Sequence, residues 1–127
     1  MDKKENSANK RKTGGFYEQK AAKYLSSQGV KILECNYRNR IGEIDLIGQE
    51  NDYLVFFEVK YRKDNQIGDP AEAVTYSKQK TICKVADYYR MCHAIGESAA
   101  VRYDVIAVCG KEWTWYRNAF AHIYTYR

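Results

Sequence analysis

The segment "GEIDLIGQENDYLVFFEVKYR", residues 42–62, decides the fold. Its two apolar runs, 42–49 and 52–62, flank a short polar turn, and this pattern is typical of a β-hairpin. Four charged residues nevertheless interrupt the runs: Glu43, Asp45, Glu58 and Lys60. Because burying a charge without a partner costs several kcal/mol, we expect these side chains to form pairs, to bind a metal ion or to line a cleft.

Side-chain alternation assigns the hairpin residues to faces. In the second strand, one face carries Leu54, Phe56, Glu58 and Lys60, and the other carries Tyr53, Val55, Phe57 and Val59. Both faces begin with apolar residues, so we expect a central strand that is covered on both sides. In the first strand, alternation predicts Ile44 and Leu46 on one face, and Glu43 and Asp45 on the other. Since the turn centres near residues 50 and 51, Asp45 should lie opposite a position between 56 and 58.

The remaining segments predict an α/β fold in the order αβββαβ, with a central mixed sheet flanked by helices. The other expected elements are a helix over 15–28 that ends at Gly29, a strand over 30–38, a helix from Asp69 to about His93, a strand over 101–110, and a strand or short helix over 112–126. Asp69 and Pro70 have the residue types preferred at the N-cap and first position of a helix, so we expect the second helix to begin there.

The 127-residue chain has the size of one domain and a net charge of +5. Residues 1–14 hold five Lys and Arg against two Asp and Glu, which gives +3 of that charge. This stretch lacks hydrophobic periodicity, so we expect a disordered basic tail at 1–14 and a single domain at 15–127. No apolar run is long enough for a membrane helix, and no apolar signal region begins the chain, so a cytoplasmic protein is expected.

Several classes of site lack their sequence signatures. The four cysteines form no C-x-x-C pair, so we expect reduced thiols rather than a zinc site. Neither histidine belongs to a recognisable nucleophile motif, so a triad hydrolase is unsupported. There is also no G-x-G-x-x-G or P-loop pattern.

The hairpin carboxylates suit a divalent cation beside a phosphate. Mg²⁺ prefers oxygen ligands and is held by one or two carboxylates with waters and substrate phosphates, while Mn²⁺ accepts similar ligands. Lys60 would orient an attacking water or offset charge on the phosphate. Helical periodicity also brings Glu18 to the packing face of the first helix and Lys78 to the buried stripe of the second. A salt bridge for Glu18 and a snorkelling side chain for Lys78 remain open as structural alternatives.

These residues carry a family resemblance. Asp45, Glu58 and Lys60, with Glu18 in an upstream helix, resemble the motif of the PD-(D/E)xK nuclease superfamily, which has the restriction-endonuclease-like fold. Ile44 stands where the motif's name has proline. Three segments are similar to the YraN-type family of uncharacterised bacterial proteins, which is distantly related to archaeal Holliday junction resolvases: "NYRNRIGEIDLIGQENDYLVFFEVKYR" (36–62), "GDPAEAVTYSKQK" (68–80) and "VRYDVIAV" (101–108).

The resemblance implies a Mg²⁺- or Mn²⁺-dependent endonuclease that hydrolyses phosphodiester bonds in branched DNA such as a Holliday junction. The implied catalytic residues are Glu18, Asp45, Glu58, Lys60 and Lys78. The implied metal ligands are Asp45, Glu58, the Val59 carbonyl and, through water, Glu18. Glu43 lies within the matched segment, but no chemistry is assigned to it.

Basic residues near the strand ends suggest contact with a phosphate backbone: Arg38, Arg40, Arg62 and Lys63. Scattered surface charge explains them almost equally well. DNA is the expected partner in preference to RNA, and resolving a junction would require two active sites and hence a homodimer. Two other hypotheses remain open, a nucleic-acid-binding protein that has kept the fold without catalysis, and an interaction protein whose buried charges only set strand register. Metal binding that depends on Asp45 would distinguish the enzyme from the last of these.

Overall fold

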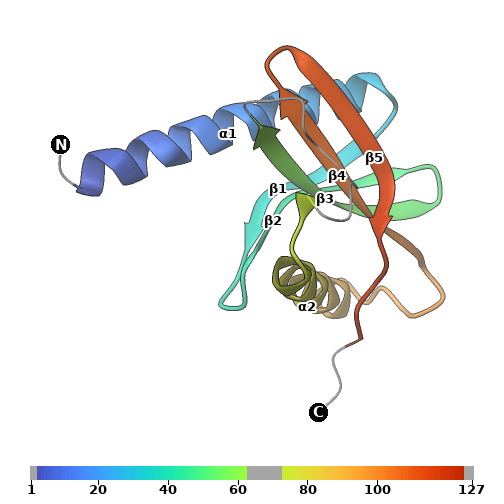
Figure 1. Ribbon diagram of the computed structural model, residues 1–127. Helices are drawn as coiled ribbons and strands as arrows, with labels where there is room; N and C mark the ends of the chain where they lie inside the picture. The colour runs from blue at the N-terminus through green and yellow to red at the C-terminus, as the bar shows by residue number, and fades with distance from the viewer. Residues whose placement is uncertain (1–2, 63–72, 125–127) are drawn as a thin grey trace.

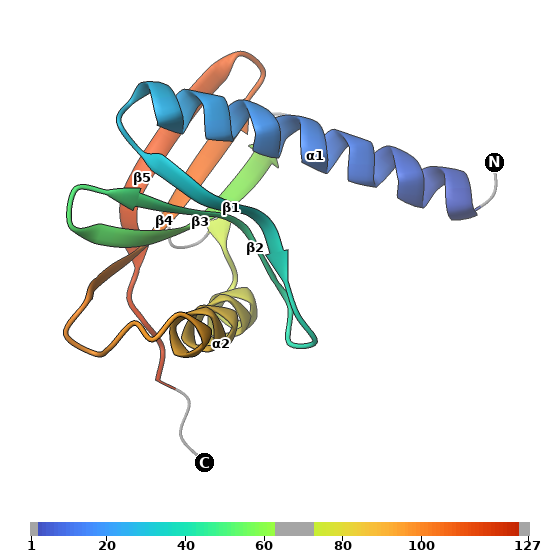
Figure 2. The same ribbon diagram turned by 180° about the vertical axis from the view of Figure 1, so that it is seen from behind.

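The computed structural model describes residues 3–62 and 73–124, with side chains from Gly15 to Tyr61 and from Ala73 onward. Five strands form one mixed sheet in the order β1-β2-β3-β4-β5. Helix α1 lies along one face and α2 covers the other (Figures 1 and 2). The elements are α1 (Lys3–Ser27), β1 (Lys31–Arg38), β2 (Glu43–Glu50), β3 (Tyr53–Arg62), α2 (Tyr76–Cys92), β4 (Ala100–Cys109) and β5 (Glu112–Phe120).

Strand β3 is the centre of the sheet, as its sequence predicts. It pairs antiparallel with β2 and parallel with β4. Leu54 and Phe56 belong to the core cluster under α2, whereas Val55 and Phe57 belong to the cluster under α1. Apolar residues on both faces of one strand therefore close both halves of the core.

The faces predicted for β2 are wrong at one pair of residues. Ile44 packs in the cluster under α2, but Leu46 packs in the cluster under α1. The pairing of β2 with β3 ends at Leu46 opposite Phe57, while β2 continues to pair with β1. Beside this point, Asn36 of β1 has a left-handed φ of 53°. Simple alternation fails here because the β1–β2 hairpin turns away from the sheet where the ladder with β3 stops.

Helix α2 begins later than predicted. Its N-cap is Thr75, whose Oγ1 accepts a hydrogen bond from the Lys78 N–H at 3.2 Å. Asp69 and Pro70, the predicted start, lie outside the described residues. Threonine is also among the preferred N-cap residues, because its hydroxyl satisfies one of the free N–H groups of the first turn.

Helix α1 and the C-terminal segment also differ from expectation. The helix begins at Lys3, so the backbone of residues 3–14 is helical rather than a disordered tail. Lysine, arginine, glutamate and alanine are good helix formers and this stretch has no proline, so a helix that is already anchored by its later turns can extend through it. At the other end, the strand alternative is confirmed because β5 pairs antiparallel with β4.

Candidate active site

The candidate site lies where the pairing between β2 and β3 ends. The last pair of their ladder is Leu46 with Phe57, so Asp45 and Glu58 lie just beyond it on neighbouring strands, close together as the hairpin predicts. The Val59 N–H donates a hydrogen bond of 2.7 Å to Asp45 Oδ2. Asp45 is only 7% exposed, and this bond fixes its carboxylate beside β3.

Glu58 is buried beside Asp45. It is 8% exposed, and its Oε2 atom is fully buried with no hydrogen-bond partner among the described residues. Lys78 Nζ lies 3.9 Å from this oxygen, beyond hydrogen-bond distance. The positive charges of Lys78 and Lys60 both act on the Glu58 carboxyl. Helical periodicity thus correctly brings Lys78 to the acidic residues.

Glu18 joins the group from α1. It shares a hydrogen bond with Asp45 and accepts another from the Asn36 side chain. Burial, followed by the negative charge of Asp45, raises the pKa of Glu18 to about 7. Asn36 was not a predicted site residue. Its one visible signal was an asparagine inside a strand, a residue type that tolerates the left-handed conformation found here.

The electrostatics of the group favour a cation. Burial is the main reason that the pKa of Glu58 rises to about 9, with the hydrogen bond to Asp45 and its charge as further causes. At neutral pH the cluster therefore holds protons that its carboxyls would release in water. A divalent cation would replace these protons, and the Glu58 Oε2, which has no hydrogen-bond partner among the described residues, could serve as one of its ligands. The donor set therefore fits the Mg²⁺ or Mn²⁺ that the nuclease resemblance implies.

The cluster is not a complete metal cage. Within the described ranges, no group of three or more His, Cys, Asp or Glu side chains is arranged to enclose a metal ion. Mg²⁺ usually takes only one or two carboxylates from the protein and fills its remaining positions with waters and substrate oxygens. Asp45 and Glu58 alone would meet that need, and Glu18 contacts Asp45.

The predicted nucleic-acid contacts are only partly described. Arg38 is exposed and forms an ion pair of 3.3 Å with Glu43, and Arg40 is exposed near the tip of the β1–β2 hairpin. The side chain of Arg62 and the whole of Lys63 lie outside the described residues. Val59 reaches the site through its N–H, and the metal-ligand role expected for its carbonyl stays a prediction.

A second charged network, which sequence reasoning missed, lies beside the first half of β3, between the levels of Tyr53 and Phe57. Arg102 donates to Asp104 through two bonds of 2.9 Å and to Glu50 Oε1 at 2.6 Å. Arg117 binds both oxygens of Glu50, and Trp115 Nε1 donates to Asp104. The two arginines lower the pKa of Glu50 to about 2. Every carboxylate here has its partners, so this network joins strands and offers no open ligand position.

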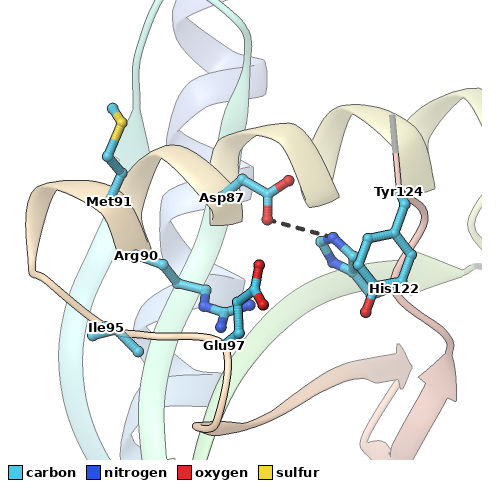
Figure 3. A pocket seen from close by; sticks show the side chains of 7 residues that line it. All are labelled: Asp87, Arg90, Met91, Ile95, Glu97, His122 and Tyr124. Carbon is cyan, nitrogen blue, oxygen red and sulfur yellow. Dashed lines mark ion pairs between the residues drawn. The ribbon is translucent and has the colours of Figure 1, made fainter. Parts of the chain in front are cut away.

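A pocket of about 680 Å³ lies near the C-terminal end of α2, and none of the residues that line it belongs to the acidic cluster. Figure 3 shows its lining side chains. Across the pocket, His122 Nε2 from the segment after β5 lies 3.4 Å from Asp87 Oδ1 of α2. On its other nitrogen, His122 contacts the Tyr103 hydroxyl at 2.6 Å. These contacts hold the C-terminal segment against α2. Lys78 and the acidic cluster lie about two and a half helical turns away along α2.

Comparison with known sequences decides the family. The model of the uncharacterised protein family UPF0102 matches residues 17–108, a range that includes all five predicted catalytic residues. The chain belongs to the UPF0102 family. This confirms the resemblance to the YraN-type proteins, and the observed core is compatible with the restriction-endonuclease-like fold.

UPF0102 relatives align over most of the chain. A UPF0102 protein of Lachnoclostridium phytofermentans is 46% identical over 88% of this chain and 95% of its own length. One from Alkaliphilus oremlandii is 48% identical over 77% of this chain and 85% of its own. A third, from Fusobacterium nucleatum, is 40% identical over 87% and 92%. These names assign no activity. In the part of the chain that the structure describes, no helix is both long and apolar enough to cross a membrane.

Proposed function

We propose that this UPF0102 protein is a metal-dependent endonuclease that hydrolyses phosphodiester bonds in nucleic acid. One observation carries the proposal. Asp45, Glu58 and Glu18 come from three separate elements to the middle of β3, where a buried oxygen of Glu58 has no hydrogen-bond partner among the described residues. In a structural ion pair the carboxylate oxygens accept hydrogen bonds from the partner, as those of Glu50 and Asp104 do in the same sheet. A buried carboxyl with an unsatisfied oxygen and a strongly raised pKa is instead a candidate for a site that binds a ligand.

Each residue of the site has its own role in the proposed reaction. Asp45, held by the Val59 N–H, and Glu58 would supply the carboxylate oxygens that hold the cation. A divalent cation bound there supplies positive charge to the phosphate and favours formation of a nucleophile from water. Lys60, two residues beyond Glu58, orients the attacking water and offsets charge on the phosphate. Lys78 partly neutralises Glu58 from α2, and Glu18 fixes the orientation of Asp45 through their hydrogen bond.

The expected substrate is DNA in preference to RNA, and a branched structure such as a four-way junction is the most specific form of the proposal. Cutting a junction symmetrically requires two copies of the site. A homodimer is therefore part of that form, whereas cleavage of a flap or a linear strand needs only one chain.

A cleavage assay tests the proposal. Labelled four-way junction, flap, linear duplex, single-stranded DNA and RNA are incubated with Mg²⁺ or Mn²⁺ and with wild type, Asp45→Asn or Lys60→Met. Asp52→Asn is the matched control, because Asp52 is an exposed aspartate in the β2–β3 turn. We expect wild type and the control to cut at least one substrate, and the two site variants to lose at least about a hundredfold in rate. Binding of a nucleic acid without cleavage by any of the four proteins would instead support the binding-module alternative.

A further inference from the structure

Three aromatic side chains form a cluster where α1 meets β3, and we call Phe16, Tyr17 and Tyr61 the aromatic platform. The rings of Tyr17 and Tyr61 stack with centroids 4.7 Å apart and planes at 22°. Phe16 meets Tyr17 edge-on at 5.4 Å. Phe16 is 50% exposed and Tyr61 is 44% exposed. Two large rings thus remain open to solvent although a stacked pair already joins α1 to the end of β3.

The platform lies where α1 meets β3, and two of its residues are neighbours in sequence of residues in the candidate site. Tyr17 precedes Glu18 on α1, and Tyr61 follows Lys60 on β3. Tyr17 adjoins Glu18 on the helix that brings Glu18 to Asp45. The Tyr61 ring lies on the α1 face of β3, whereas alternation directs Glu58 and Lys60 to the opposite face. Lys20 adds a positive charge, because its Nζ lies 4.5 Å above the Phe16 ring. Further along α1, Tyr24 instead stacks against Trp113 of β5, where the rings cover the core.

We propose that the aromatic platform stacks an unpaired base of the nucleic acid whose backbone enters the acidic site. Every base has an aromatic face, so stacking on Phe or Tyr accepts any sequence but requires that the base be out of its duplex. A neighbouring cation such as Lys20 favours the phosphate of the same nucleotide. This inference rests on the proposed function, and it narrows the substrate to single strands, flaps or frayed branch points.

The test is the binding of oligonucleotides that carry the fluorescent base 2-aminopurine, in EDTA so that no cutting occurs. Single-stranded DNA, the same strand as duplex, and single-stranded RNA are titrated with wild type, Phe16→Leu, Tyr61→Leu and Tyr61→Phe. Tyr53→Leu is the matched control, because Tyr53 lies on the same strand, is 43% exposed, and contacts an arginine rather than the platform. Circular dichroism checks that each variant is folded.

Stacking predicts that wild type quenches the fluorescence of the single strand more than that of the duplex. Phe16→Leu and Tyr61→Leu should weaken single-strand binding about tenfold, while Tyr61→Phe and Tyr53→Leu bind as wild type does. The DNA and RNA arms show which backbone the site accepts. Single-strand binding that is absent, or unchanged in both leucine variants, would overturn the inference.

The outcomes also separate this inference from the proposed function. If wild type cuts nucleic acid with Mg²⁺ but the leucine variants bind and cut single strands normally, the base-stacking role of the platform is refuted and the nuclease proposal is supported. If wild type shows platform-dependent quenching but cuts nothing with Mg²⁺ or Mn²⁺, the nuclease is wrong and the platform belongs to a binding protein.

Discussion

The Val59 N–H donates to Asp45 Oδ2 at 2.7 Å, so the residue after Glu58 holds the carboxylate that lies at the end of the β2–β3 ladder. This bond does two things. It stands in for the next step of the strand pairing, and it fixes one acidic side chain beside another. The acidic cluster is therefore built into the sheet itself, which makes its structural and electrostatic effects separable by mutation.

Asp45→Asn and Asp45→Ala should separate the two effects. Asparagine still accepts the bond from Val59 but removes the negative charge that acts on Glu18 and Glu58. We expect Asp45→Asn to be as stable as wild type or more so in urea unfolding at pH 8 without metal. Alanine leaves the Val59 N–H unsatisfied, so Asp45→Ala should be less stable than Asp45→Asn by about 1–3 kcal/mol. Equal stabilities would mean that the bond contributes nothing.

Glu58 should make the metal-free protein less stable as the pH rises. Its pKa in the folded protein is about 9, well above the 4.5 of an ordinary glutamate, so the folded state binds the proton more tightly than the unfolded chain. The free energy of unfolding therefore falls between about pH 4.5 and pH 9. Glu58→Gln removes this dependence because glutamine stays neutral. Urea titrations across that range should give a wild-type curve that falls relative to the variant by on the order of a few kcal/mol.

A parallel Glu58→Gln curve would contradict that prediction. Glu34→Gln is a suitable control, since Glu34 is a β1 glutamate outside the acidic pair of Asp45 and Glu58. Its curve should keep the wild-type slope over the same range. A slope that disappears in both variants would point to general charge repulsion rather than to the buried carboxyl.

Glu50 should act in the opposite direction at low pH. Arg117 and Arg102 lower its pKa to about 2, so its ionised form stabilises the fold above about pH 4.5 and this stabilisation is lost as the pH falls toward 2. Glu50→Gln should cost about 1.5–3 kcal/mol at pH 7, because it weakens hydrogen bonds to two guanidinium groups. The cost should shrink at pH 2.5, as thermal unfolding at the two pH values would show. A cost that is the same at both would mean that charge is not its cause.

The β1–β2 hairpin should be sensitive to one added methyl group. A Cβ at Gly42 would meet Thr81 Cγ2 of α2 at 2.5 Å. Gly42→Ala should therefore destabilise the protein by about 1–3 kcal/mol through overpacking. Adding Thr81→Ser removes the clashing methyl and should recover most of the loss. Gly96→Ala is the control because nothing lies within 4 Å of its added Cβ. Failure of Thr81→Ser to rescue would place the strain elsewhere in the hairpin.

The parts of the site that could be predicted follow from local periodicity. The turn at residues 50 and 51 fixes Asp45 beside Glu58, and helical spacing turns Glu18 and Lys78 inward. The start of α2 could not be fixed, because Asp69 and Thr75 are both good caps. The separation of Ile44 and Leu46 onto opposite faces could not be foreseen either, since alternation assumes a straight strand with partners on both sides.

Long-range partners were the least visible from sequence. Glu50 and Arg102 are 52 residues apart and meet because β3 and β4 run parallel. Tyr17 and Tyr61 meet only after α1 has packed across the end of β3. No spacing rule predicts such contacts, because they depend on the order of strands and the direction of a helix over the sheet. The aromatic platform therefore emerged only from the structure.

The claim on which the account depends most is that the acidic cluster takes up a divalent cation in exchange for protons. Isothermal titration of Mn²⁺ into wild type, Asp45→Asn and the control Asp52→Asn, in two buffers of different ionisation enthalpy, measures both binding and proton release. We predict binding to wild type and to the control that tightens from pH 6 to pH 8 and releases protons from Glu18 and Glu58. We predict no binding to Asp45→Asn. Binding that is absent from wild type, or that is the same in Asp45→Asn, would contradict the account.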